Sequence, residues 1–336
     1  FDTRGRNGWL AENPAEDAVE IRLGAPSIKT ASRPPNADNS RRATAAMTEE
    51  TGQSADPNEA FSLVASELRF GVLQALWDLS TGDGGSSASF ADLHEASGIR
   101  DSGQFNYHLD QLTPQFVRKV DGEYQLTAAG RRVVGAAFSG SLTDLETTVD
   151  PRPIRDCPEC GGTITLQYGH GQMYVKCRDC ESHEADMHAP PVLVATADTD
   201  EIEALLGKHL LTEIQRLTRG FCLYCGGPLD AEFQRDDEGR LHEDWSVSFS
   251  CEVCGHVSYS LVTGVVLDHP AVVSLLHEAG IDIREIPLWE LDSLLNAAER
   301  VVSRDPLRVE TTIEIDDAAL TLQLDESLSV VEYERH

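Results

Sequence analysis

Lysine is almost absent from this sequence, with only four among 336 residues. Acidic residues number 57 against 27 basic ones, so the formal net charge is −30. A chain this negative is not expected to cover nucleic acid non-specifically or to bind an anionic membrane. Its self-repulsion also disfavours a compact state unless salt screens it. We therefore interpret the composition as an adaptation to a salty, halophilic cytoplasm; the alternative is a protein that is merely acidic.

Long apolar runs and secretion signals are missing too. No apolar stretch approaches the ~18 residues that a membrane span needs, and no segment has the layout of a signal peptide. These absences predict a cytoplasmic protein with no membrane partner. The sequence also lacks a glycine-rich phosphate loop, an H-E-x-x-H motif, a nucleophile elbow and a plausible catalytic triad. We therefore expect that the chain is not an enzyme and has no catalytic residue.

The first part of the chain lacks apolar periodicity. Residues 1–46 carry a net charge of +1, so the other 290 residues carry −31. We predict that residues 1–56 are disordered and that Met47 is the natural start, which would place residues 1–46 upstream of it. The alternative is a regulatory tail. Residues 57–147 and 148–336 are then expected to form two folded domains.

Helical periodicity becomes strong from residue 58 onward. Apolar residues recur at three- and four-residue steps, which indicates an amphipathic helix or helix pair: Phe61, Val64, Leu68, Val72, Leu73 and Leu76. After a glycine- and serine-rich loop, "FADLHEASGI" predicts a short helix that ends near Gly98. "RDSGQFNYHLDQL" predicts a second one with Asp101 or Ser102 as its N-cap. Two short helices joined by a tight turn form a helix-turn-helix.

The second of these helices has the residues of a DNA reader. Phe105, Leu109 and Leu112 would face a core. The residues off that stripe mostly carry hydrogen-bonding groups that can read base edges in the major groove: Ser102, Gln104, Asn106, Tyr107 and Gln111. "FVRKVDGEYQLT" then predicts a hairpin turning at its Asp-Gly pair. A last helix capped by Thr127 completes a winged helix-turn-helix.

"DSGQFNYHLDQL" and "FVRKVDGEYQLTAAGRRVV" resemble the ArsR-like winged-helix transcriptional regulators, especially those of halophilic archaea. The resemblance covers roughly residues 57–147. It implies DNA contact by Ser102, Gln104, Asn106 and Tyr107, with His108 near the phosphate backbone. Metal-sensing members carry a cysteine motif in this domain, whereas this segment has no cysteine. The resemblance therefore implies DNA binding without metal sensing.

Charge around the predicted helix-turn-helix is balanced. Residues 95–135 hold five basic and five acidic residues. At high salt little counterion release is left to drive binding, so groove fit and hydrogen bonds must carry more of the affinity. Arg118 and Lys119 on the wing are the expected phosphate contacts, although each could be an ordinary solvated charge. The alternative for the whole segment is a winged helix that docks on a protein.

All eight cysteines fall into four C-x2-C pairs. Cys157, Cys160, Cys177 and Cys180 form one set, and Cys222, Cys225, Cys251 and Cys254 form the other. Two such pairs can close a tetrahedral site around one ion, and a hairpin is predicted between the pairs of each set. Glycine after three pairs permits a tight turn whose amides point at the sulfurs. We predict two zinc ribbons, at 157–180 and 222–254.

Four thiolates fill the coordination of zinc, so the two ions are expected to be structural cofactors rather than catalysts. Iron also suits a four-thiolate site, whereas disulfides are disfavoured in a reducing cytoplasm. Pairing between the two sets is another alternative. Four nearby histidines could be alternative ligands but are expected to be surface or hairpin residues: His170, His183, His188 and His256.

The rest of the chain predicts an α+β region. A helix is expected between the ribbons, ending at Gly220, and two more over "HPAVVSLLHEAG" and "IPLWELDSLLNAAERVV". Three alternating segments after residue 306 predict a C-terminal antiparallel sheet. The fold class is thus α+β: a winged helix-turn-helix, then two zinc ribbons and a sheet. Residues 150–336 loosely resemble regions that follow winged helices in halophilic archaeal regulators.

These features together predict a DNA-binding transcriptional regulator. Its partners would be double-stranded DNA and, through the zinc-stapled domain, a partner protein, an effector or a second copy in a homodimer. The alternative is a zinc-ribbon accessory factor that docks on the transcription machinery through protein contacts. A thiol or metal enzyme would need an open coordination site, which eight cysteines in two complete sets do not leave.

Overall fold

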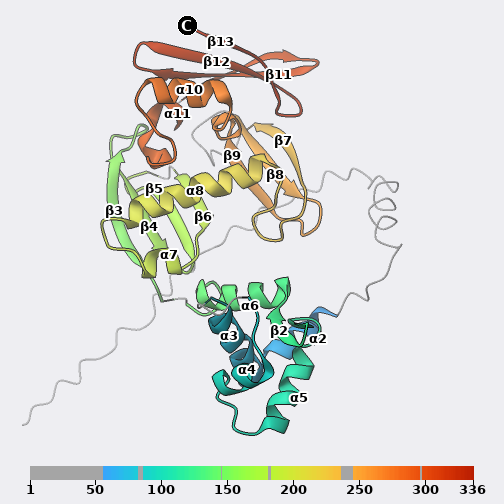
Figure 1. The fold of residues 1–336 in the computed structure, drawn as a ribbon. Coiled ribbons are helices and arrows are strands. Elements are labelled where there is room, and N and C mark those ends of the chain that lie inside the picture. Colours follow the sequence, from blue (N-terminus) through green and yellow to red (C-terminus); the bar gives the residue numbers. More distant parts are fainter. Residues whose placement is uncertain (1–55, 82–85, 145, 181–182, 236–244, 296) are drawn as a thin grey trace, which may run out of the picture. The chain divides into compact units, whose positions relative to one another are not determined.

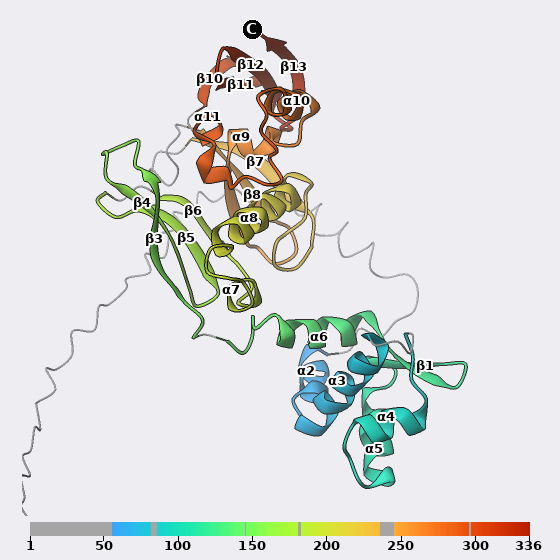
Figure 2. The same cartoon turned by 60° about the vertical axis from the view of Figure 1, so that its left-hand side comes forward.

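The computed structural model describes residues 56–81, 86–144, 146–180, 183–235, 245–295 and 297–336. The chain divides into two units, residues 1–56 and 57–336, and the described structure lies almost entirely in the second. Its fold is α+β, as predicted: helices with a β-hairpin, then antiparallel sheets with two groups of four cysteines, and a C-terminal four-stranded antiparallel sheet (Figures 1 and 2).

The N-terminal helical region follows the order of elements expected from the sequence. Its helices are α2 (Pro57–Val64), α3 (Glu67–Thr81), α4 (Phe90–Ala96), α5 (Ser102–Leu112) and α6 (Ala128–Phe138), and its hairpin is β1 (Val117–Val120) with β2 (Glu123–Leu126). The side chains of Asp101 and Thr127 cap α5 and α6. Asp121 and Gly122 at the hairpin turn both have positive φ, 51° and 90°, as a type I′ turn requires.

The core of this region confirms the inward face of α5. Phe105, Leu109 and Leu112 are buried in one cluster with residues of α3, including Val72 and Leu73. The stripe predicted before them is only partly right, because Phe61 is 72% and Leu68 39% exposed. The reason is a bend between α2 and α3, since two separate helices need not turn one continuous stripe inward.

The first cysteine group sits in a sheet of order β3-β4-β5-β6. The strands are β3 (Val149–Asp156), β4 (Thr163–Gly169), β5 (Gln172–Cys177) and β6 (His183–His188). The predicted turn between β4 and β5 is confirmed, with His170 and Gly171 at φ 52° and 74°. The short helix α7 (Val192–Ala195) follows β6.

Helix α8 (Ile202–Thr218) lies between the two cysteine groups in sequence and spans from the first sheet to the second (Figures 1 and 2). Its Ile202 and Leu206 belong to the core of the first sheet, and its Leu211 and Leu217 to the core of the second part. The second sheet has the order β7-β8-β9, with β7 (Leu229–Arg235), β8 (Trp245–Cys251) and β9 (Val257–Leu261). The turn predicted at "DDEG" lies outside the described residues.

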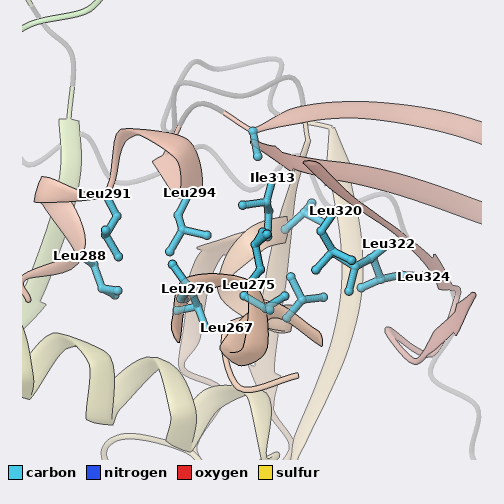
Figure 3. Close-up of a cluster of buried hydrophobic side chains, with 14 of the residues drawn as sticks. Leu267, Leu275, Leu276, Leu288, Leu291, Leu294, Ile313, Leu320, Leu322 and Leu324 are labelled. Atoms are coloured by element: carbon cyan, nitrogen blue, oxygen red, sulfur yellow. The ribbon is translucent and has the colours of Figure 1, made fainter. Parts of the chain in front are cut away.

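The last part packs helices against a four-stranded sheet. Helices α9 (Val262–Val266) and α10 (Pro270–Glu278), a 3-10 turn η1 (Leu288–Glu290) and α11 (Asp292–Leu295) precede β10 (Ala298–Arg304), β11 (Leu307–Ile315), β12 (Ala318–Asp325) and β13 (Val330–Arg335). Figure 3 shows Leu275 and Leu276 of α10 on the side of the sheet where Ile313, Leu320 and Leu322 lie. Trp289 and Leu291 are buried core residues, as predicted.

Two predictions for this part are wrong. The helix expected over 286–302 is limited to η1 and α11, because Ala298–Arg304 instead pairs with β11. The C-terminal sheet therefore has four strands rather than three. Among the described residues, no helix combines the length and the apolar character that crossing a bilayer would take.

Candidate metal centres and nucleic-acid interface

The first cysteine group brings four sulfurs together at one end of its sheet. Cys157 and Cys160 lie in the turn before β4, and Cys177 and Cys180 lie at and just after the end of β5. The sulfur of Cys157 is 3.8 Å from that of Cys180, and the sulfur of Cys160 is 3.6 Å from that of Cys177. Ligands about 2.3 Å from a tetrahedral ion lie about 3.8 Å from one another. The spacing therefore suits one bound metal ion.

The second group has the same geometry in the second sheet. Cys222 and Cys225 precede β7, Cys251 ends β8, and Cys254 lies in the turn before β9. The sulfur distances are 3.7 Å for Cys222 to Cys254 and 3.4 Å for Cys225 to Cys251. All eight cysteines are free, and each quartet closes locally. The structure thus favours two separate metal sites over disulfides or pairing between the quartets.

Backbone amides point at the sulfurs, as the glycines predicted. The amides of Gly162 and Gly227 lie 3.3 Å from the sulfurs of Cys160 and Cys225. The amide of Asp179 lies 3.3 Å from the sulfur of Cys177, in the one pair that no glycine follows. Gly161 and Gly226 have φ of 70° and 71°, which a side chain would strain. Amide donors stabilise thiolates, the form that binds a metal.

The four thiols of a quartet cannot all ionise without a cation. The amide of Cys254 helps to lower the pKa of Cys251 to about 6. The amide of Gly227 has the largest single effect on Cys225 and acts in the same direction, but the three neighbouring cysteines and burial together outweigh it, and the pKa of Cys225 is raised to about 12. Two thiolates 3.4 Å apart would repel each other, which explains why the pKa of Cys251 is lowered while that of Cys225 is raised. A divalent ion would remove this repulsion, so the donor set fits a metal such as zinc.

Each candidate metal site consists of four cysteine sulfurs alone among the described residues. No further group of three or more histidine, cysteine or acidic side chains is placed to hold an ion in the described part of the chain. The imidazole rings of His170, His188 and His256 therefore belong to neither quartet. The side chain of His183 is not among those described. Four sulfurs complete a tetrahedral ion and leave no position for a reacting water.

Helix α5 has one fixed face and one exposed face. Its first turn is held by the carboxylate of Asp101, which accepts a hydrogen bond of 2.6 Å from the amide of Gln104. Its apolar face is buried in the core. The side chains predicted to read bases are all exposed, and Tyr107 is 57% exposed: Ser102, Gln104, Asn106, Tyr107 and Gln111. The structure thus leaves all five accessible on the exposed side of α5.

The remaining predicted DNA contacts differ in accessibility. His108 is only 9% exposed, with its ring edge-to-face against Tyr107 at 5.3 Å. This burial leaves little of the ring for a phosphate contact, and the position near the phosphate backbone stays a prediction. Arg118 on β1 is exposed and donates a 3.0 Å hydrogen bond to Gln125. Lys119 is exposed and lies over the ring of Tyr124, 5.0 Å from its centre.

Asp110 contacts one of the candidate site residues, a contact that the sequence reasoning missed. Its carboxylate accepts a 2.9 Å hydrogen bond from the side-chain amide of Asn106, so it orients one of the predicted base readers. The i, i+4 spacing of the two residues is the signal that could have shown it. Asp110 also places a negative charge on the exposed face of α5.

Comparison with known proteins identifies two domain families. The family model described as domain of unknown function DUF7351 matches residues 155–330. A second one, domain of unknown function DUF7347, matches residues 57–137. A search of curated proteins found no match. The first match spans both cysteine quartets and most of the C-terminal sheet, and the second spans the helices and the hairpin.

Proposed function

Because this chain belongs to the DUF7351 family, a domain of unknown function, its role must be argued from its own residues, and we propose that it is a DNA-binding transcriptional regulator. Residues 57–147 act as a winged helix-turn-helix of the ArsR-like type, in which α5 is the recognition helix. The observation that carries this proposal is the set of exposed hydrogen-bonding side chains on a helix whose other face is buried in a core.

Each quartet holds zinc as a structural ion in this proposal. Zinc is favoured over iron because both sites are built as C-x2-C pairs beside paired antiparallel strands, the layout of a zinc ribbon. The ions add to the backbone hydrogen bonds that close the cysteine-bearing turns, such as that from the amide of Cys157 to the carbonyl of Gly162. The stapled region then serves as a platform for a partner, an effector or a second copy, in a cytoplasm rich in salt.

Selective DNA binding is tested by replacing two of the base readers. The double variant Gln104→Ala/Tyr107→Ala should lose about 30-fold or more in affinity for a selected DNA duplex, because each of two base contacts contributes on the order of 1–3 kcal/mol of discrimination. Both residues are exposed, so the fold should be unaffected. The measurement is retention of DNA selected from a random duplex pool at high potassium chloride concentration.

The matched control is Gln323→Ala/Tyr333→Ala, which removes the same two residue types from the C-terminal sheet. It should leave DNA retention unchanged. Equal retention by wild type and the α5 variant would reject α5 as the recognition helix.

The alternative function is that of an accessory factor docking on the transcription machinery. One observation favours it: the second cysteine region exposes several large apolar side chains, namely Phe221, Tyr224, Val253, Val257 and Tyr259. Exposed apolar and aromatic clusters are typical of protein contacts. Stable co-purification with RNA polymerase, together with no DNA preference, would support this function over the first.

A further inference from the structure

The exposed side of α5 carries a polar pair whose orientation the structure fixes. Asn106 and Asp110 are both exposed and lie one helical turn apart, at positions i and i+4. The side-chain nitrogen of Asn106 donates a 2.9 Å hydrogen bond to a carboxylate oxygen of Asp110. This hydrogen bond determines which groups of Asn106 remain available to a ligand.

The carboxylate sets the direction in which the Asn106 amide faces. A side-chain amide has an oxygen that accepts hydrogen bonds and a nitrogen with two donating hydrogens. A carboxylate only accepts hydrogen bonds, so a flipped amide would place its oxygen against the negative oxygens of Asp110. The nitrogen of Asn106 therefore faces Asp110 and uses one N–H there. The second N–H and the oxygen remain free for a ligand.

The position of the pair on α5 makes these groups accessible. The other side of the helix is buried in the core through residues such as Phe105 and Leu109. Gly103 lies one turn before Asn106 on the exposed side and has no side chain beyond its backbone. A glycine of this kind permits close approach of another molecule to the helix. A nucleic-acid groove can therefore come close to the first two turns of α5.

The remaining donor and acceptor of Asn106 match adenine among the four bases. In the major groove adenine presents its N6 donor beside its N7 acceptor, which an asparagine amide meets with its oxygen and one N–H. Guanine presents two acceptors, O6 and N7, so it would face the oxygen of Asn106 and the charge of Asp110. Cytosine offers one donor and thymine one acceptor. Each of these two bases can therefore use only half of the amide.

We propose that Asn106 reads an adenine in the major groove and that Asp110 is the positioning residue that fixes this specificity. The charge of Asp110 lowers the affinity for any duplex, because it repels the phosphate backbone. Asp110 thus increases selectivity at the expense of overall affinity. This inference rests on the DNA-binding role proposed above and adds the base that one position of the target holds.

The test compares the base preferences of wild type, Asn106→Ala and Asp110→Asn. Each full chain is used to select DNA from the same random duplex pool at high potassium chloride concentration. Wild type should prefer adenine over guanine at one position by about fivefold or more, because a bidentate contact contributes on the order of 1–3 kcal/mol.

Both variants should change the preference at that position alone. Asn106→Ala should lose it, and Asp110→Asn should reduce it several-fold, because the new side chain both donates and accepts and no longer fixes the orientation of Asn106. An unchanged preference in either variant, or a loss of preference at every position, would overturn the proposal.

Affinity for a duplex without the selected site separates positioning from a structural role. Asp110→Asn removes a negative charge, so it should bind such a duplex at least as tightly as wild type while its preference for adenine falls. The matched control is Asp78→Asn, which removes the same charge from the exposed surface of α3 and should keep the full preference. Weaker binding of every duplex by Asp110→Asn would assign Asp110 to the stability of α5 and overturn its positioning role.

The contact to N7 is tested on the DNA side. The selected adenine is replaced by an analogue that has carbon in place of N7. Wild type should bind the altered duplex about fivefold more weakly, because one hydrogen bond contributes on the order of 1 kcal/mol, and Asn106→Ala should bind both duplexes equally. Equal binding of both duplexes by wild type would overturn the assignment of Asn106 to adenine.

Failure of this inference is distinguishable from failure of the proposed function. If wild type enriches no sequence at all, the regulator proposal falls and this inference falls with it. If wild type enriches a site whose base preferences are the same in Asp110→Asn, only the role of Asp110 is rejected and the regulator proposal stands.

Discussion

At the residue scale, two glycines of α6 are a sensitive test of how the helical region is packed. A Cβ at Gly130 would lie 2.3 Å from the carbonyl oxygen of Phe116, which is backbone and cannot give way. Gly130→Ala should therefore lower the stability of this region by about 2 kcal/mol. A Cβ at Gly135 meets nothing within 4 Å, so Gly135→Ala should raise stability by about 0.5–1 kcal/mol.

The measurement for both glycine variants is native-state hydrogen exchange of α3 and α6 amides in the full chain. If the two substitutions change stability in opposite directions, a general effect of alanine in this helix is excluded. A neutral Gly130→Ala would mean that α6 is not held against Phe116.

Tyr168 should make the stability of the first sheet depend on pH. Its hydroxyl donates a 2.8 Å hydrogen bond to the carbonyl of Ala189, and burial, with a smaller effect of Asp144, raises its pKa to about 12. A raised folded-state pKa favours the neutral phenol, so its stabilising effect is complete below pH 10 and is lost as pH rises from about 10 to 12. Tyr168→Phe should cost about 1 kcal/mol at neutral pH, with the difference shrinking across that range.

The pH profile of unfolding for wild type and Tyr168→Phe is the measurement, and the exposed Tyr333→Phe is the control. Parallel profiles for wild type and Tyr168→Phe up to pH 12 would show that the Tyr168 hydroxyl is not buried in solution.

At the element scale, features that depend on nearby residues could be predicted from the sequence, whereas the pairing of distant segments could not. The quartets, the capped α5 and the Asp-Gly hairpin each depend on residues close together in the chain, and each is confirmed. Strand β3 contains Pro151 and Pro153, which argue against a strand unless it lies at an edge. Strand β10 followed an apparently helical run and became a strand only through pairing with β11.

Metal removal should separate the elements that depend on an ion from those that do not. The helices α2–α6 contain no cysteine, whereas the turns beside β4, β5, β7, β8 and β9 are closed by sulfurs. A strong chelator should therefore release amide protection in these sheets and leave α3 and α5 protected, because binding energy at a structural metal site is also folding energy. The measurement is hydrogen exchange of the full chain before and after chelation.

Two single variants serve as the control for metal removal. Cys177→Ser and Cys222→Ser should each reduce the metal content from two ions to one, with exchange released only around the altered quartet. Loss of both ions from either variant would mean that the sites are not independent.

At the scale of the whole molecule, the net charge of −30 predicts that salt stabilises the fold. Raising potassium chloride from ~0.1 M to ~1 M shortens the Debye length from about 10 Å to about 3 Å and so removes most repulsion between surface acids. The unfolding temperature should therefore rise and then level off near this concentration. The chloride salt is used because sulfate would stabilise the protein in another way, by its exclusion from the protein surface.

The triple variant Glu314→Gln/Glu332→Gln/Glu334→Gln, on exposed positions of the last sheet, should be more stable at low salt and respond less to added salt. An unfolding temperature equally independent of salt in both proteins would show that self-repulsion does not limit this fold.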